Sequence, residues 1–248
     1  MNMYRLLAAM FFCLAPAGVR SARADDAPAN WGRTASHADF LQAARRPFLK
    51  HAWGRFEGSV QHRGKDGLRK VSLELGLLMH PEYLRAQFIL EGNDVYNVMQ
   101  AYTEEGVSNV RVDVPETTRA PSLRAFGITP SDITFSFLYW EFMEEELLDR
   151  VRGQLCRVFR LRNPQTFETV TAWFSVRYLG VLRVDFFKPG AADWHRRLEF
   201  TDFTREGELY YVRTAQLRGK DWKTMVTFDQ AELALTSDAL PPENLFRP

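Results

Sequence analysis

Residues 56–79 read FEGSVQHRGKDGLRKVSLELGLLM, and this stretch determines the fold class. Small or apolar residues alternate with polar ones from Phe56 to Gln61, which is the two-residue period of a strand with one buried face. The sequence Gly64-Lys65-Asp66-Gly67 then has the composition of a tight turn. Beyond the turn, apolar residues return at every second position from Val71 to Met79. The stretch therefore predicts an antiparallel β-hairpin.

The same alternation continues after this hairpin and predicts a long antiparallel sheet. Three runs, 84–90, 95–102 and 107–114, follow one another closely, so the first strands form a meander. Further strands are predicted at 152–162, 167–178, 182–187, 196–204, 208–217 and 222–233. A meander of about eleven strands curls, because the right-handed twist between neighbouring strands accumulates. We therefore predict an α+β, mostly β, protein whose curled antiparallel sheet forms an incomplete barrel.

Helical signals occur at two places. Residues 36–39 have the spacing of a capping box, and a helical period follows them until Pro47. Between the fifth and sixth predicted strands, proline and glycine interrupt the chain, and 122–126 and 131–137 are predicted to form short helices. A curled sheet has a concave apolar face that must be filled or covered. We predict that the insert 121–140 caps this concave face.

The N-terminus has the pattern of a secretory signal. Arg5 precedes an apolar run from Leu6 to Ala17, and the small-x-small site Ala22-Arg23-Ala24 follows. The run is too short for a helix that spans ~30 Å of hydrocarbon, so a cleaved signal fits better than an uncleaved anchor. We predict export to the periplasm with cleavage after Ala24, and three regions: a signal peptide at 1–24, a flexible segment at 25–35 and a single lipid-binding domain at 36–248.

Charge and cysteine content restrict the partners and the chemistry. The chain carries a net charge of +1, and loss of the predicted signal, which holds three arginines and no acid, changes it to −2. This balance gives no reason to expect nucleic acid as a partner. Loss of the signal also leaves Cys156 as the only cysteine, so no intrachain disulfide is predicted. We expect Cys156 to be a small core residue.

Residues 136–147, SFLYWEFMEEEL, place a row of apolar side chains beside four carboxylates. Glu141 and the run 144–146 have the chemistry for a hard cation or for acid–base catalysis. However, no histidine lies near them in the sequence and their spacing is not that of a calcium loop. A solvated edge is the better interpretation, because runs of charge are mostly exposed. Neither a metal nor another cofactor is predicted.

Motifs of common enzyme classes are not recognisable in the sequence. The five histidines form no local metal-binding spacing, and no Gly-x-Ser-x-Gly, P-loop or His-Glu-x-x-His motif occurs. A Ser-His-Asp triad assembled across the fold stays open, because triads are recognised by geometry. We predict that the chain is not an enzyme and keep an exported hydrolase as an alternative.

The aromatic run from Phe135 to Met143 is almost contiguous. Neither a two-residue nor a 3.6-residue period buries such a run on one face only. Two interpretations follow. The run is either a helix and strand end within a filled core, or the rim of an apolar cavity that accepts a ligand.

Several sequence segments resemble those of a known family in their order along the chain and in their residues. They are PSDITFSFLYW (130–140), VRGQLCRVFRLRNP (151–164), TVTAWFSVRY (169–178), LRVDFF (182–187), KDWKTMVTF (220–228) and LPPENLF (240–246). The chain from about Ala38 to Phe246 resembles the LolA/LolB-like proteins, which sort outer-membrane lipoproteins in bacteria, and most closely a less characterised branch.

This resemblance implies an incomplete barrel, capped by helices, whose apolar interior receives lipoprotein acyl chains. The implied partners are lipid or lipoprotein acyl chains and inner- or outer-membrane lipoprotein-transport components. A carrier is needed because exposure of such chains costs about 0.8 kcal/mol per CH2 group. An arginine on an early strand holds the helical lid in such carriers, and we nominate Arg55 for this lid contact.

The predicted lining comes from the strands and from the insert. It consists of Leu75, Leu77, Phe88, Leu90, Met99, Phe137, Leu138, Trp140, Trp173 and Phe174. A one-residue change of register would exchange the two faces of any of these strands. The alternative function is a sensor or interaction module with a filled core, which meets a partner through a sheet edge or the acids at 141–146.

Overall fold

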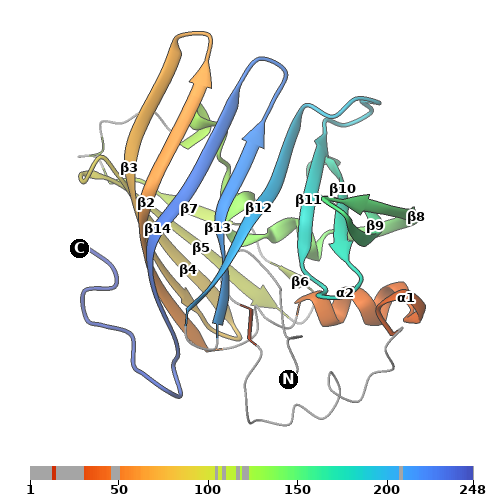
Figure 1. Ribbon diagram of the computed structural model, residues 1–248, viewed down its shortest axis with the longest axis horizontal. Helices are drawn as coiled ribbons and strands as arrows, with labels where there is room; N and C mark the ends of the chain where they lie inside the picture. Colours follow the sequence, from red (N-terminus) through yellow and green to blue (C-terminus); the bar gives the residue numbers. More distant parts are fainter. Residues whose placement is uncertain are drawn as a thin grey trace.

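The computed structural model describes residues 13–14, 31–45, 51–103, 106–107, 110–115, 118, 123–206 and 209–247. A single antiparallel sheet, curled but not closed, dominates the molecule (Figure 1). Twelve of its strands follow one another in the order β6-β5-β4-β3-β2-β14-β13-β12-β11-β10-β9-β8. The predicted fold class, a mostly β incomplete barrel with few short helices, is confirmed.

The elements have the following bounds. The strands are β1 Cys13–Leu14, β2 Ala52–Gly64, β3 Gly67–Met79, β4 Tyr83–Leu90, β5 Asp94–Thr103, β6 Gly106–Val107, β7 Arg111–Asp113, β8 Glu141–Val151, β9 Gln154–Arg162, β10 Thr169–Ser175, β11 Val181–Phe187, β12 Arg196–Glu206, β13 Leu209–Arg218 and β14 Lys223–Leu235. The helices are α1 Trp31–Thr34, α2 His37–Arg45, α3 Pro130–Thr134 and the 3-10 turns η2 Leu123–Phe126 and η3 Ser136–Tyr139.

The predicted first hairpin is confirmed. Strands β2 and β3 pair along their whole length, from Ala52 opposite Met79 to Gly64 opposite Gly67. Gly67 has a φ of 100°, which only glycine adopts readily, so the turn needs this residue. On β3 the odd-numbered residues from Val71 to Met79 are buried, and their side chains form part of the concave face.

The sheet is not a simple meander, because its first long strand pairs with its last. Strand β2 lies beside β14, so the two halves of the chain join in the middle of the sheet and the edges are formed by β6 and β7 on one side and β8 on the other. The connection between β7 and β8 therefore has to travel from one edge of the sheet to the other. It does so across the concave side, where its short helices lie (Figure 1).

Strand β8 was missed in the sequence and accounts for the difference between eleven and twelve strands. Its residues are almost all exposed, and it lies at the edge of the sheet, where it pairs with β9. Exposure on both faces removes the alternation on which the prediction depends. The predicted strand 107–114 is likewise replaced by the short strands β6 and β7.

The structure describes only part of the N-terminal region to which these predictions apply. Except for β1, which pairs with the start of β13, the predicted signal peptide lies outside the described residues. Residues 31–34, at the end of the predicted flexible segment, form the helical turn α1, and the Trp31 ring stacks on Phe40 of α2 with centroids 6.3 Å apart. Among the described residues, no helix combines the length and apolar character required to cross a bilayer.

Two apolar clusters lie on opposite faces of the sheet. The large one fills the concave side, and a small one on the convex side is formed by Val151, Cys156, Val158, Trp173 and Leu182. Cys156 is fully buried there, as predicted, and burial raises the pKa of its thiol to about 11. This thiol is therefore protonated and inert at neutral pH.

The C-terminal residues 239–247 cross the convex side of the sheet. Gln87 of β4 donates to the carbonyl of Arg247 and accepts from its backbone N–H, at 2.9 and 2.7 Å. The carbonyl of Leu245 lies so close to Gly76 of β3 that a Cβ there would stand 2.3 Å from it. The sequence predicts only a brief turn at this end, whereas the structure shows a segment bonded to several strands.

Candidate binding site

The concave face of the sheet is lined by aliphatic and aromatic side chains from both halves of the chain. Of the predicted lining, the strands contribute Leu75, Leu77, Phe88, Leu90 and Phe174, all in the large concave cluster and at most 4% exposed. Phenylalanines that were not predicted complete this lining. They are Phe56, Phe159, Phe186, Phe200 and Phe228.

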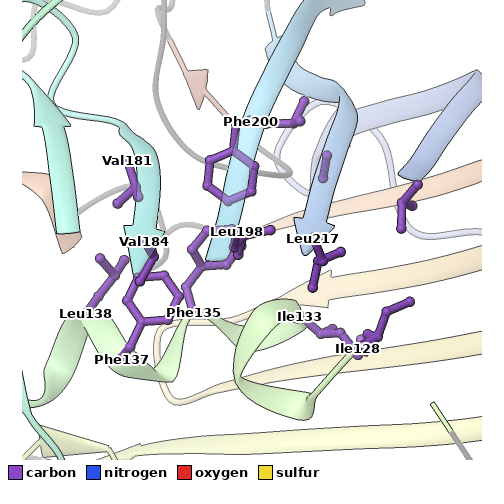
Figure 2. Packing of buried hydrophobic residues seen from close by; sticks show 14 of the residues in the cluster. Ile128, Ile133, Phe135, Phe137, Leu138, Val181, Val184, Leu198, Phe200 and Leu217 are labelled. Atoms are coloured by element: carbon purple, nitrogen blue, oxygen red, sulfur yellow. The ribbon is translucent and has the colours of Figure 1, made fainter. Parts of the chain in front are cut away.

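The segment 123–140, here called the cover segment, packs its apolar side chains against this lining. Phe137, Leu138 and Trp140, the three insert residues of the predicted lining, are buried in the same cluster. Phe135 lies 5.6 Å from Phe200, and Phe137 lies 5.9 Å from Phe186, measured between ring centroids (Figure 2). The cover segment thus occupies the interior with its own phenylalanines.

The contiguous aromatic run is explained by the backbone of Phe135. This residue ends α3 and precedes η3 in the left-handed conformation, with φ 55° and ψ 31°. A phenylalanine in this region is unusual and costs about 1–3 kcal/mol of strain. Because the chain direction changes here, Phe135 and Phe137 both point into the interior, which one regular helix would not allow.

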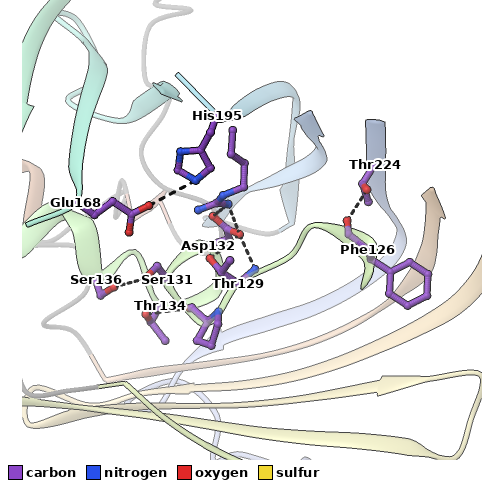
Figure 3. A network of polar contacts seen from close by, with 11 residues as sticks. Phe126, Thr129, Ser131, Asp132, Thr134, Ser136, Glu168, His195 and Thr224 are labelled. Carbon is purple, nitrogen blue, oxygen red and sulfur yellow. Dashed lines mark hydrogen bonds and ion pairs between the residues drawn. The ribbon is translucent and has the colours of Figure 1, made fainter. Parts of the chain in front are cut away.

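A buried ion pair holds α3 to the sheet. Arg196 at the start of β12 donates to both carboxylate oxygens of Asp132, at 2.5 and 2.6 Å, and both side chains are less than a tenth exposed (Figure 3). The guanidinium also lies over the Phe186 ring, 3.7 Å from its centroid. The same carboxylate accepts from the Thr129 backbone N–H, at 2.7 Å, and so forms the capping box of α3.

Two weaker anchors hold the ends of the cover segment. The Thr224 hydroxyl of β14 donates to the carbonyl of Phe126 at the η2 end, at 2.5 Å (Figure 3). The Arg45 side chain of α2 donates to the carbonyl of Leu138 at the η3 end, at 2.7 Å. Backbone hydrogen bonds of the segment such as Ile128 to Leu123 close within it. Its attachment to the sheet therefore depends on side chains.

Replacement of Thr224 with valine is expected to lower the free energy of unfolding by about 1–3 kcal/mol, because the buried hydroxyl bonds both the Phe126 carbonyl and the His62 ring. Urea unfolding followed by tryptophan fluorescence measures this difference. Thr227→Val is the matched control on the same strand, since Thr227 is only half-buried and its change is expected within about 0.5 kcal/mol of zero. An equal effect of both changes would contradict the anchoring role.

Glu168 and His195 lie beside the buried ion pair. His195 Nε2 is 3.7 Å from Glu168 Oε1 (Figure 3). Burial is the main reason that the pKa of Glu168 is raised and also the main reason that the pKa of His195 is lowered. Both shifts favour the neutral forms.

The acids after Trp140 lie on β8 and are solvated or paired. Glu141 accepts from Arg162 at 2.8 Å, and Glu145 forms two 2.6 Å bonds with Arg157 of β9. Among the residues that the structure describes, no group of three or more histidine, cysteine or acidic side chains is arranged to hold a metal ion.

Two residues of the predicted lining lie away from the concave interior. Met99 is 47% exposed, because its side chain lies on the face of β5 opposite to the buried residues Val98 and Gln100. Trp173 belongs to the convex cluster and donates to Asp149 at 2.9 Å. The sequence did not decide which face of each strand is concave, and both residues lie on the convex face. Neither residue is retained in the proposed lining.

The nominated lid contact, Arg55, does not reach the cover segment. Its guanidinium donates to the backbone carbonyl and the side-chain oxygen of Asn244, at 3.1 and 2.6 Å, on the convex side. Its neighbour Phe56 points to the concave face, so Arg55 has to point away from it. The arginine that contacts the cover segment by a buried ion pair is Arg196.

The sequence contains a signal for this anchor that the prediction did not use. Thr129-Pro130-Ser131-Asp132 has the pattern of a helix start, with an acid at the capping position. Arg196, Leu198 and Phe200 are spaced by two residues on one strand, so their side chains lie on the same face. Arg196 therefore places a charge on an apolar face. A buried charge on such a face requires a partner.

Solved structures that share this fold include the following three. A DUF1329 family protein from Desulfovibrio piger aligns with a TM-score of 0.64 at 12% identity, over 88% of this chain and 99% of that one. An outer-membrane lipoprotein-sorting protein domain from Vibrio parahaemolyticus has a TM-score of 0.56 at 8% identity, over 82% and 93% of the two chains. A LolA superfamily protein from Nitrosomonas europaea has a TM-score of 0.56 at 7% identity, over 85% and 100%.

The chain therefore has the fold of LolA-like proteins, as its sequence predicts. At these identities the likeness concerns the fold alone. No family model and no curated protein matches the sequence.

Proposed function

We propose that this protein is a non-catalytic periplasmic carrier that binds the acyl chains of lipoproteins or other lipids beneath the cover segment. The observation that supports this proposal is the attachment of the cover segment. Its apolar side chains lie on a continuous apolar face, and a few side-chain bonds from Arg196, Thr224 and Arg45 hold it there. A hydrocarbon chain can replace such side chains with contacts of the same kind.

Cargo would exchange with side chains of the cover segment rather than enter an empty space. Phe135 and Phe137 are 0% exposed, so cargo would take the place of the cover segment's phenylalanines. The hydrophobic effect is non-directional, and an acyl chain buries about 0.8 kcal/mol per CH2 group, so a long chain compensates for the displaced rings. The two strong polar bonds of Asp132 then determine how readily the cover segment opens.

Mass spectrometry of lipid that co-purifies with the protein from a periplasmic extract tests the proposal. The wild type is expected to carry lipid, and Trp140→Glu is expected to lose it with an unchanged circular dichroism spectrum, because it places a charge on the concave side. Trp173→Glu is the matched control, since Trp173 is buried to the same degree but on the convex side, and this variant is expected to retain lipid.

Absence of lipid from the wild type would contradict the carrier and support a second candidate, an interaction module with a filled core. The open edge of β8 favours this candidate, because Leu147 is 91% exposed there, with Met143 and Leu148 nearly half exposed. An unpaired edge is a template for an additional strand. Repulsion between the acids at 144–146 of two copies disfavours self-pairing and favours a basic partner strand.

A further inference from the structure

A group of polar side chains, one buried and three partly buried, lies at the end of the concave side where β5 meets η3 and the last turn of α2. It consists of Gln100 and Tyr102 of β5, Tyr139 of η3 and Arg45 of α2, here called the polar cluster. The rings of Tyr102 and Tyr139 are 5.5 Å apart, and the Arg45 guanidinium lies 5.3 Å from the Tyr139 ring centroid. Tyr139 therefore lies between the other tyrosine and the arginine.

Several polar atoms of this cluster are buried without a hydrogen-bond partner. Gln100 is 0% exposed, and neither its amide oxygen nor its amide nitrogen is bonded within the described chain. The hydroxyls of Tyr102 and Tyr139 are likewise buried and unbonded there. Gln100 and Tyr139 are near enough to affect the pKa of Tyr102, but no hydrogen bond of normal geometry joins the three. Buried polar groups in this state are rare, and each costs about 1–3 kcal/mol.

The tyrosines in this cluster act as neutral donors. Burial is the main cause that raises the pKa of Tyr102, and it also raises the pKa of Tyr139 to about 12. Both hydroxyls therefore keep their protons at physiological pH. Together with the Gln100 amide they supply three groups that can donate a hydrogen bond.

Arg45 adds a positive charge to the cluster. Its one hydrogen bond, from Nε to the Leu138 carbonyl, leaves the terminal nitrogens of the guanidinium available, and no ion pair of Arg45 occurs among the described residues. Burial lowers its pKa, the expected direction for a cation removed from water, although an arginine remains charged. The cluster is therefore rich in donors and positive, so it disfavours a cation.

From this arrangement we infer that the polar cluster binds the carboxyl group at the end of an acyl chain. Its two oxygens would accept hydrogen bonds from Tyr102, Tyr139, Gln100 and Arg45, and the hydrocarbon would extend from Gln100 past Leu84, its cross-strand neighbour, along the concave face. The inference rests on the proposed carrier function and specifies the class of its ligand. The carboxyl group can belong to a free fatty acid or to an ester of a lipid anchor.

Binding of three probes with the same chain distinguishes these sources. The probes are hexadecanoate, methyl hexadecanoate and hexadecyltrimethylammonium, each titrated below its micellar concentration against the purified, delipidated protein. The cationic probe is expected to bind about tenfold more weakly than the better of the other two. Tighter binding of hexadecanoate than of its ester identifies a free fatty acid as ligand, whereas equal or tighter binding of the ester identifies an ester-linked chain.

Variants then test whether the cluster is responsible. Gln100→Leu and Tyr102→Phe are each expected to reduce the preference for the carboxyl probe over the cation about tenfold, without loss of thermal stability, because they remove unpaired polar atoms. Gln87→Leu is the matched control. Gln87 is also buried in this half of the sheet, but its amide is fully bonded on the convex side, so this change is expected to destabilise the fold and leave the preference unchanged.

The outcomes separate this inference from the carrier function. If all probes bind equally, or if Gln100→Leu and Tyr102→Phe leave the preference unchanged, the cluster is merely hydrated, and the inference fails while the carrier stands. If none of the probes binds to the wild type, the carrier function and the inference fail together.

Discussion

Replacement of Arg196 with methionine is expected to lower the free energy of unfolding by about 3–5 kcal/mol, because it leaves the buried carboxylate of Asp132 without its counter-ion. Asp132 would keep only the backbone N–H and the hydroxyl of Thr129, two neutral donors for a carboxylate that is only 4% exposed. At about 2–4 °C per kcal/mol for a chain of this size, the midpoint of thermal unfolding should fall by roughly 10 °C. Differential scanning calorimetry and urea unfolding both measure this change.

The neighbouring residue Arg197 provides a control with the same chemistry. Asp185 accepts hydrogen bonds from Arg197 and also from Arg183, so it keeps one arginine when Arg197 is replaced with methionine. We expect this change to cost less, about 1–2 kcal/mol, because the buried Asp185 carboxylate keeps both of its hydrogen bonds from Arg183. If Arg196→Met proved as mild as Arg197→Met, the ion pair with Asp132 would not be an important anchor.

The double replacement Arg196→Met with Asp132→Leu separates loss of the pair from loss of one partner. A buried ion pair gains little over apolar residues of similar volume, because both charges must be desolvated. The double variant is therefore expected to recover most of the stability that Arg196→Met loses. The recovery is incomplete, because Asp132 also caps α3.

The local pattern of the sequence was sufficient to locate most strands but not to predict which strands pair with one another. Alternation identified the hairpin at 56–79 and most later strands, because each has one buried face. That β2 pairs with β14 could not be read from a local period, since the pairing joins residues such as Val60 and Val226 that lie far apart in the sequence. The crossing of the connection over the concave side follows from this pairing.

The prediction of the site failed where a single register decides which face is buried. Leu75 and Phe88 were placed correctly on the concave face, whereas Met99 and Trp173 lie on the opposite face of strands whose two sides both carry large apolar residues. Arg55 failed for the same reason, since its neighbour Phe56 takes the inward position. The residues missed altogether, such as Arg196 and Gln100, are polar residues on an apolar face, which an apolar pattern does not select.

The interior beneath the cover segment is the place where the two candidate functions differ most. Phe137 of the cover segment is fully buried against the sheet. For both candidate functions, Phe137→Ala is therefore expected to cost about 3–5 kcal/mol of stability. The carrier predicts a second effect that the filled module does not. If the Phe137 ring and the cargo compete for one space, its removal should tighten the binding of a fluorescent acyl probe by about tenfold, since about 1.4 kcal/mol of competing burial corresponds to that factor.

Trp173→Ala separates this gain from a general effect of loosened structure. It removes a large side chain, 8% exposed, from the convex cluster and is expected to lower stability by a similar amount without tightening the binding of the probe. Titration of both variants with the probe, at a temperature well below their unfolding midpoints, gives the comparison. Tighter binding by Phe137→Ala alone is the expected result, because only on the concave side does a protein side chain occupy the position that the hydrocarbon needs. Equal gains in both variants would show that the probe reports loosened packing, and no gain in either would mean that the phenylalanines of the cover segment are permanent core.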